Sequence, residues 1–519
     1  MACDLLVVGG GINGCAIARD AAGRGLCVRL VEQGDLACGT SSASTKLIHG
    51  GLRYLELYEF RLVHEALAER ELLLGAAPHV IRPLKFVLPH EPSLRPAWLV
   101  RLGLFLYDHL AWRKRLEGSH MVTLPGTPFG APLRDGYKTG FTYADCWVDD
   151  SRFVVLNALD AAARGATIEV GARLVSARRA GEVWRAQAAH GGGVEEIEAR
   201  ALVNAAGPWV SQVLDEALHV RSRKHVRLVK GSHLVTRRLF EGEHAYILQN
   251  PDKRIVFAIP YEQDFTLIGT TDVAHDGAPG PVAIGDAETD YLLDSLNRFL
   301  RRPATRADIV WSYAGLRPLY DDGALDASVV TRDYAFDLDA PPGEAPALSV
   351  FGGKITTARR LAEHAMDDLA PYFPDLKPAW TKGAIFPGGD MGDEGFEGFL
   401  ARLSLEKPFL EPALARRLAR AYGTRVFRIL GSASGVGDLG RDFGCGLTAA
   451  EVAYLVQEEW ARAADDVLWR RSKLGLHMSA EQQAALREFM TRIPAPHARL
   501  TESRISPHIR NGRARPLLP

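Results

Sequence analysis

The chain has 519 residues, which is too long for one small core and suggests roughly three domains. An apolar share of 47% and a charged share of 24% are typical of a globular protein and argue against a disordered chain. The formal net charge of −1 gives no overall attraction to nucleic acid, so we expect no nucleic-acid partner.

The cysteines and the hydropathy exclude further classes of protein. The six cysteines include no CxxC pair, which argues against a zinc site, an iron–sulfur cluster and a disulfide framework, and we expect no bound metal. The chain begins with an apolar run rather than a basic leader, and it has no stretch of about 18 apolar residues. We therefore expect a protein of a reducing, cytoplasm-facing compartment that does not cross the membrane.

The N-terminal segment carries a dinucleotide-binding pattern. A strand, a helix and a second strand are predicted over Asp4–Val8, Cys15–Arg24 and Cys27–Val31. The turn after the first strand has the form GxGxxG and comprises Gly9, Gly11, Ile12, Asn13 and Gly14. Such glycines let a pyrophosphate approach the helix N-terminus, and Glu32 at the tip of the second strand can bond a ribose hydroxyl. The alternative, a glycine-rich turn without a ligand, does not explain why all these features occur in order.

Two later segments distinguish FAD from NAD. The first is an apolar strand that ends in small residues, over Val203–Trp209. The second is a strand broken by a glycine pair, over Leu348–Thr356, and a helix over Thr357–Leu369 follows it. The expected cofactor contacts in these segments are Ala206, Gly207, Trp209, Gly352, Gly353, Lys354, Ile355 and Thr356. Each segment could be a plain strand–turn–helix. Together with the first pattern they favour FAD, because a flavin extends well past the pyrophosphate.

The segment Gly39–Leu55 resembles the flavin-contacting loop of the FAD-dependent glycerol-3-phosphate dehydrogenases, most closely those of the bacterial aerobic (respiratory) type. Further matches to that family occur at Asp145–Asp150, Lys230–His233, Ile268–Asp272, Gly315–Leu319, Phe351–Thr357 and Arg462–Arg471, so the resemblance runs nearly from end to end. It implies that the cofactor contacts in the loop are Thr40, Ser41, Ser42, Lys46, Leu47, His49, Gly50 and Gly51.

The same resemblance implies an α/β fold. The expected architecture is a Rossmann-like FAD-binding domain of the D-amino-acid-oxidase type with an inserted mixed-sheet substrate domain and a C-terminal α-helical domain. The FAD domain would comprise residues of about 1–75, 145–215 and 315–370, the substrate domain about 76–144 and 216–314, and the helical domain 388–519. The residues agree with this layout: a hairpin is predicted over Arg254–Pro260 and Phe265–Thr271, and amphipathic helices are predicted over Glu411–Tyr422 and Thr448–Ser472.

The resemblance implies oxidation of glycerol 3-phosphate to dihydroxyacetone phosphate. The phosphate dianion of this substrate needs cationic donors, preferably arginines that can bind two oxygens at once. Arg317 is the expected anchor, and the other candidate substrate contacts are Arg53, Tyr54, Arg332, Lys354 and Thr270, with Asp272 nearby. Because most basic residues lie on protein surfaces, composition alone would not single out any of these cations.

Two histidines compete for the role of the base that accepts the hydroxyl proton. A histidine is suited to this role because its ordinary pKa lies near working pH. His49 lies in the flavin loop beside two glycines, and His233 ends the Lys230–His233 segment. The residues leave the choice between them open.

The electron acceptor implied by the resemblance is a membrane quinone, which requires contact with a bilayer. In the segment Leu94–Leu116 a helix would carry Trp98, Leu102, Phe105, Leu106 and Trp112 on one face, with basic residues beside them. Such a helix can lie in the headgroup region of a membrane, although a core helix with basic ends has the same pattern. Peripheral attachment to the cytoplasmic face of the inner membrane is therefore an expectation that rests more on the resemblance than on the residues. A homodimer is implied only by the resemblance.

Three other functions remain open from the sequence. An oxidase of the same fold would pass the electrons to oxygen and release hydrogen peroxide. An amino-acid oxidase would pair one carboxylate-binding arginine with an apolar pocket, which fits the several cations less well. A flavin-binding sensor without catalysis would have Arg317, Lys354 and His49 directed away from the flavin.

Overall fold

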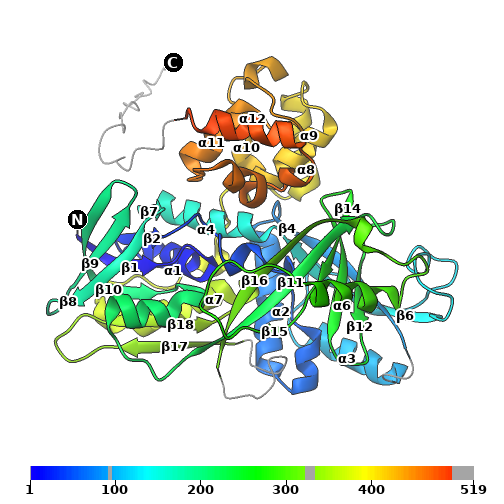
Figure 1. Ribbon diagram of the computed structural model, residues 1–519, viewed down its shortest axis with the longest axis horizontal. Coiled ribbons are helices and arrows are strands. Elements are labelled where there is room, and N and C mark those ends of the chain that lie inside the picture. Colours follow the sequence, from blue (N-terminus) through cyan, green and yellow to red (C-terminus); the bar gives the residue numbers. More distant parts are fainter. Residues whose placement is uncertain (1, 92–95, 322–332, 494–519) are drawn as a thin grey trace, which may run out of the picture.

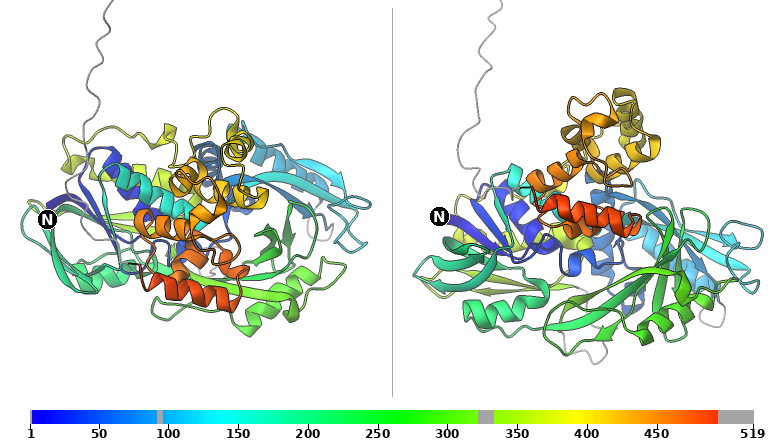
Figure 2. Two further views of the ribbon diagram at one scale, coloured as in Figure 1. Left: turned by 90° about the horizontal axis from the view of Figure 1, so that it is seen from above. Right: turned by 45° about the horizontal axis from the view of Figure 1, so that its top comes forward.

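The computed structural model describes residues 2–91, 96–321 and 333–493. Two β-sheets lie next to each other along the long axis of the molecule, and the C-terminal helices lie on one side of both (Figure 1). Seen from above, these helices lie over the middle of the molecule, where the two sheets meet (Figure 2). None of the described helices combines the length and the apolar character needed to cross a bilayer.

The first sheet contains eight strands within the described residues, in the order β17-β18-β10-β1-β2-β7, with β9 paired to β10 and β8 to β9. The strands are β1 (Ala2–Val8), β2 (Val28–Glu32), β7 (Thr167–Val170), β8 (Arg173–Arg179), β9 (Trp184–His190), β10 (Gly193–Asn204), β17 (Tyr334–Asp339) and β18 (Ala347–Gly352). The central strands β18, β10, β1, β2 and β7 run parallel. Their apolar side chains are buried, as expected for a parallel sheet covered on both faces.

Three helices cover one face of this sheet: α1 (Ile12–Gly23), α4 (Asp150–Ala163) and α7 (Ala358–Leu369). Their apolar residues form the largest core of the protein with the inner face of the sheet. The predicted strands and helices at this sheet are confirmed with shifted ends. The first helix begins at Ile12 rather than Cys15, because the glycine turn ends at Gly11 and Gly14 already belongs to the helix.

The second sheet contains ten strands within the described residues and is mainly antiparallel. The strands are β3 (Leu47–Ile48), β4 (Ile81–Pro89), β5 (His120–Thr123), β6 (Thr139–Val148), β11 (Val226–Arg237), β12 (Ala245–Gln249), β13 (Ile255–Tyr261), β14 (Phe265–Gly269), β15 (Val273–Ala274) and β16 (Ile309–Tyr320). The predicted hairpin is β13 and β14, which pair antiparallel. Around this sheet lie α2 (Phe60–Ala76), α3 (Ala97–His109) and α6 (Asp286–Asn297), and α5 (Val210–Gln212) follows the end of β10.

The C-terminal helices have a core of their own. They are α8 (Gly395–Glu406), α9 (Pro412–Tyr422), α10 (Val426–Leu430), α11 (Ala449–Glu458), α12 (Ala480–Met490) and the π-helix η11 (Asp466–Arg471). The continuous helix predicted over Thr448–Ser472 is wrong. Trp460 has a φ of +59°, which ends α11, and the carboxylate of Asp466 accepts from the backbone N–H of Arg462 at 2.7 Å to start a new helical segment. The domain limits expected from the sequence stay predictions.

Candidate active site

A cavity of about 690 Å³ lies where the two sheets meet. Its walls include the ends of β1, β2, β10 and β18, the loop between β2 and β3, and β16 of the second sheet. All the predicted cofactor contacts line this cavity except Gly14, Ser42, Lys46 and Gly50. Ligands of open parallel sheets bind outside the carboxyl ends of the strands, and this cavity occupies that position.

The glycine turn after β1 is a close-packed cradle. A Cβ atom at Gly14 would lie 1.9 Å from the carbonyl oxygen of Gly9, and Gly9 itself has a φ of +111°. Gly14 therefore acts by packing α1 onto the turn rather than by lining the cavity. The cap of α1 is Gly11, which makes no side-chain capping bond, so the positive end of the helix is directed at the cavity lined by Gly11 and Ile12.

Glu32 lies at the tip of β2 and lines the cavity. Its carboxylate accepts from the backbone N–H of Gly10 at 2.6 Å and from that of Gly34 at 2.7 Å. Burial raises the pKa of this carboxyl group, while the two backbone donors act in the opposite direction. The bonds hold Glu32 where a ribose hydroxyl can reach it.

A second glycine cradle follows β18. Gly353 has a φ of +97°, and a Cβ atom there would lie 3.0 Å from the amide nitrogen of Asn13. Asn13 donates from this nitrogen to the carbonyl oxygen of Gly352 at 3.1 Å, whereas its buried Oδ1 has no hydrogen-bond partner among the described residues. The two glycine cradles, the helix N-terminus and the available amide oxygen of Asn13 fit a flavin dinucleotide, which these residues would hold along the cavity.

Arg317 lies on the cavity wall in β16, where three acceptors hold its guanidinium group. It pairs with the carboxylate of Asp272, donates to the carbonyl oxygen of Thr271 at 3.2 Å and donates to the hydroxyl of Thr270 at 2.6 Å. Gly231 on the neighbouring strand leaves room for this group, because a Cβ atom there would lie 2.1 Å from Nη2 of Arg317.

Glu288 of α6 supports the same turn from behind. Its buried carboxylate accepts from the hydroxyls of Thr271 and Ser232, both at 2.8 Å, and pairs with Lys230 at 2.7 Å. Sequence reasoning did not identify this residue, because a single acid on an amphipathic helix has no distinguishing pattern. The turn that holds Arg317 is thus fixed on both sides.

Lys354 and Tyr54 line the cavity together, with the ammonium group of Lys354 4.0 Å from the centre of the Tyr54 ring. Thr270 also lines it. Two other predicted substrate contacts cannot be placed: Arg332 lies outside the described residues, as does the side chain of Arg53.

The two histidines occupy different positions. His49 lines the cavity, and burial lowers the pKa of its imidazole, while the negative charge of Asp145 opposes this effect. His233 is fully buried and is not among the residues that line the cavity. Its ring stacks on Tyr313 with centroids 4.7 Å apart, and its Nε2 lies 3.0 Å from the hydroxyl of Thr45, which does line the cavity.

Lys46 is also fully buried behind the wall. Its ammonium group lies 2.9 Å from both carboxylate oxygens of Asp150 and donates to the carbonyl oxygen of Ser42 at 3.1 Å. Burial lowers the pKa of Lys46, and the paired Asp150 raises it. The geometry places Lys46 as a support of the loop rather than on its cavity face.

Asp145 lines the cavity near His49, although the sequence suggested no role for it. Its buried carboxylate accepts from Arg70 at 2.6 Å and from the hydroxyl of Tyr107 at 2.8 Å. The hydroxyl of Tyr107 in turn accepts from the backbone N–H of Gly50 at 2.8 Å. The segment Asp145–Asp150 was a signal for this residue, but a motif does not tell which of its carboxylates faces a cavity.

The parallel sheet, its glycine cradles and the adjoining mixed sheet define a Rossmann-type dinucleotide-binding oxidoreductase. The chain belongs to the family of FAD-dependent oxidoreductases that includes the bacterial glycerol-3-phosphate dehydrogenases. The model of the FAD dependent oxidoreductase family matches residues 4–359, and the model of the C-terminal domain of alpha-glycerophosphate oxidase matches residues 379–502. The cofactor is therefore FAD, and the fold class expected from the sequence is confirmed.

Relatives and a solved structure match almost the whole chain. The chain is 54% identical to the glycerol-3-phosphate dehydrogenase of Pseudomonas aeruginosa, over 94% of each chain. It is 51% identical to the D-erythritol 1-phosphate dehydrogenase of Brucella abortus, over 94% of this chain and 97% of that one. The glycerol-3-phosphate dehydrogenase of Bacillus halodurans, solved with FAD, is similar in structure with a TM-score of 0.72 and 27% identity, over 94% of each chain.

Proposed function

We propose that the protein oxidises sn-glycerol 3-phosphate to dihydroxyacetone phosphate and passes the electrons through FAD to a membrane quinone. The observation that carries this proposal is the position of Arg317, Lys354 and His49 on the wall of one cavity beside the glycine cradles. A phosphate-binding cation, a second cation and a neutral imidazole are the groups that oxidation of a phosphorylated secondary alcohol needs.

Each of these groups has a defined task in the proposed reaction. Arg317, held by Asp272 and Thr270, binds the phosphate and fixes the register of the substrate. His49 accepts the hydroxyl proton, for which its lowered pKa keeps it neutral near pH 7. The two glycine cradles and Glu32 would hold FAD, which would supply the hydride acceptor for the carbon that carries the hydroxyl group.

The experiment that tests this proposal is anaerobic reduction of the holoenzyme, followed as loss of flavin absorbance. We expect rapid bleaching with glycerol 3-phosphate and none with glycerol, which lacks the phosphate. No bleaching with glycerol 3-phosphate would overturn the proposal. D-Erythritol 1-phosphate belongs in the same experiment, because the Brucella abortus relative is almost as similar as the Pseudomonas aeruginosa one. Faster reduction by the longer substrate would reassign the alcohol and leave the phosphate anchor intact.

The electron acceptor is tested separately. A quinone analogue should reoxidise the reduced flavin much faster than oxygen does, with little hydrogen peroxide formed. Stoichiometric peroxide with oxygen would instead identify an oxidase of the same fold. The homodimer is a further prediction, which light scattering of the detergent-purified holoenzyme tests.

We propose that α3 attaches the protein peripherally to the cytoplasmic face of the inner membrane. Trp98 and Phe105 of α3 are 68% and 48% exposed, and Leu102 and Leu106 are exposed beside them, so this part of the predicted apolar face is not buried in a core. Trp112, predicted on the same helical face, instead follows the end of α3 at His109 and is 84% exposed. In contrast, Leu104 and Tyr107 on the other side of the helix are buried. The helix lies at the periphery of the second sheet (Figure 1). Exposed aromatic residues beside arginines suit the headgroup region of an anionic bilayer.

A further inference from the structure

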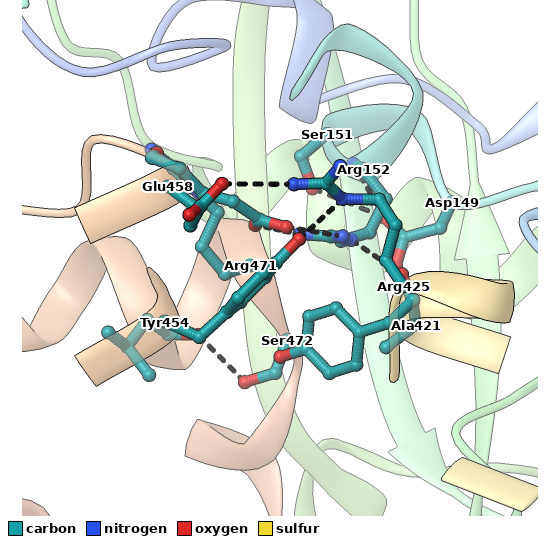
Figure 3. Close-up of polar contacts among 12 residues, drawn as sticks. Asp149, Ser151, Arg152, Ala421, Arg425, Tyr454, Glu458, Arg471 and Ser472 are labelled. Carbon is teal, nitrogen blue, oxygen red and sulfur yellow. Dashed lines mark hydrogen bonds and ion pairs between the residues drawn. The ribbon is translucent and has the colours of Figure 1, made fainter. Parts of the chain in front are cut away.

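Buried charges join the C-terminal helices to the cofactor-binding part of the chain. Arg152 of α4 binds both carboxylate oxygens of Glu459 and donates to the carbonyl oxygen of Ala421 at 3.0 Å. Figure 3 shows the surroundings of this contact, with Asp149, Ser151 and Arg152 from the start of α4 and Arg471 and Ser472 from the C-terminal segment. Because both Arg152 and Glu459 are almost fully buried, this contact is an ion pair of the protein interior rather than a surface ion pair.

Asp35 extends this contact to the loop after β2. Its carboxylate receives both ends of the Arg471 guanidinium group, each at 2.7 Å, and it also pairs with Arg470. Arg471 is fully buried and Asp35 nearly so. The same loop lines the cofactor cavity at Gln33, Cys38 and Gly39. Two arginines of the C-terminal π-helix therefore hold a loop of the cofactor site.

The N-terminus of α4 provides a second connection. On its outer side the hydroxyl of Ser151 accepts from Lys473 of the C-terminal segment at 2.9 Å. On its inner side the carboxylate of Asp150 accepts from Lys46 at 2.9 Å and from the hydroxyl of Ser44 at 2.7 Å. Ser44 lines the cavity and Lys46 supports the loop behind it. Adjacent residues of one helix thus join the C-terminal segment to the flavin-contacting loop.

From these two connections we infer that the C-terminal helical unit is a positioning element for FAD, acting through Arg471 on Asp35 and through Lys473 on the N-terminus of α4. None of these four groups needs to touch the cofactor, because each holds a segment that lines the cavity. The inference depends on FAD as the cofactor and does not depend on which alcohol is oxidised. Its failure and the failure of the proposed substrate are therefore distinguishable.

The test is the rate at which FAD leaves the holoenzyme after dilution, followed by the rise of free-flavin fluorescence. Asp35→Asn and Arg471→Met each remove the bidentate charge pair, and we expect FAD to dissociate about tenfold faster from either variant. Arg471→Lys keeps the charge but loses the planar fork, so its rate should lie between those of the wild type and Arg471→Met. The visible circular dichroism of the bound flavin should change in the same order.

The matched control is Arg417→Met. Arg417 of α9 binds both carboxylate oxygens of Glu451 in α11, at 2.8 and 2.7 Å, within the C-terminal unit. This variant should lower the melting temperature as much as Arg471→Met does but leave the FAD dissociation rate unchanged. Equal FAD dissociation from both variants, or wild-type dissociation from Asp35→Asn, would overturn the inference.

A further variant covers the case in which the unpaired buried charge prevents folding. In the double variant Asp35→Asn/Arg471→Gln neither residue is charged, and Arg470 keeps its pair with Asp466, so no uncompensated charge is buried. It should fold, and it should still release FAD faster than the wild type because the bidentate pair is absent. Wild-type retention of FAD in this double variant would also overturn the inference.

Discussion

Arg317 is set in the cavity wall by its partners on a neighbouring turn. Asp272, Thr270 and the carbonyl group of Thr271 fix the plane of its guanidinium group, and Gly231 provides the space that this plane occupies. A planar cation fixed in this way loses little conformational freedom when a dianion binds. The residue is therefore suited to anchor a phosphate group.

Replacement of Arg317 should mainly weaken substrate binding and should have a smaller effect on the stability of the folded protein. We expect Arg317→Ala to lower the second-order rate constant of flavin reduction about 100-fold, because a charge-assisted bidentate contact is lost. Arg317→Lys should recover only part of this loss. Stopped-flow absorbance of the anaerobic holoenzyme measures this rate constant. The control is Arg306→Ala, which replaces an exposed arginine that pairs with the carboxylates of Asp286 and Asp290, and an equal effect of both replacements would contradict the assignment.

The pH dependence of flavin reduction should identify the base. Burial lowers the pKa of His49 below its ordinary value of about 6.5, so the imidazole is neutral and can accept a proton above that pH. The reduction rate should be constant above pH 6.5 and fall as the pH drops through the lowered pKa. His49→Gln should be slow and should lose this fall. The substrate phosphate also titrates in this range, and a fall that persists in His49→Gln would assign the dependence to the phosphate.

The two candidate histidines show that a sequence motif does not decide which side chain lines the cavity. Both are in segments that match the family; the segment of His49 lines the cavity, and the segment of His233 pairs with β16, which contributes Arg317 to the cavity wall. The side chain of His233 nevertheless packs on Tyr313 behind Thr45, whereas His49 reaches the wall. The sequence identifies the segment in which each histidine lies. The direction of the histidine side chain depends on the strand with which that segment pairs.

At the scale of elements, α3 has one buried face and one exposed aromatic face. Tyr107 on its buried face binds Asp145, so the helix that presents Trp98 to the outside also supports the cavity wall. Such a helix can bring a membrane surface close to the flavin without any spanning segment. The sequence predicted the aromatic face, and only packing decided that this face stays exposed.

Charge on the exposed face of α3 should weaken the proposed membrane attachment. We expect Trp98→Glu/Phe105→Glu to reduce binding to vesicles of anionic phospholipid about tenfold or more, because apolar area in the headgroup region is lost. Cosedimentation with the vesicles measures this, and anaerobic flavin reduction by glycerol 3-phosphate should be unchanged. Leu405→Glu is the control, since Leu405 on α8 is 82% exposed and lies outside α3. Wild-type binding by the double variant would rule out α3 as the attachment site.

At the scale of the whole molecule, His79 lies where the cofactor-binding part meets the C-terminal helices. It is buried, and neither of its ring nitrogens has a hydrogen-bond partner among the described residues. Gly388 packs on it so closely that a Cβ atom there would lie 3.3 Å from Nε2. Burial, with the charges of Arg152 and Arg420, lowers the pKa of His79 to about 3.

This histidine should make the junction sensitive to acid. Unfolded His79 takes up a proton below pH 6.5 and folded His79 only near pH 3, so the folded protein loses about 1.4 kcal/mol of stability for each pH unit between them. Glutamine at position 79 cannot titrate. Between pH 6.5 and 5 the free energy of unfolding of His79→Gln should therefore fall by about 2 kcal/mol less than that of the wild type. Melting temperatures of both proteins across this range measure the difference. Parallel pH profiles would contradict the prediction.

The family resemblance implied the fold class, and the residues themselves determined the dinucleotide turn, the parallel strands and the hairpin β13–β14 and favoured FAD. These features depend on local chemistry: glycines at positive φ, buried apolar runs and a carboxylate at a strand end. The tertiary structure decided the break at Trp460, the burial of His233 and Lys46, and the roles of Asp145 and Glu288. It also decided the pairing of Asp35 with Arg471, which are 436 residues apart. Contacts between distant residues depend on how the sheets and helices pack, and no local pattern encodes them.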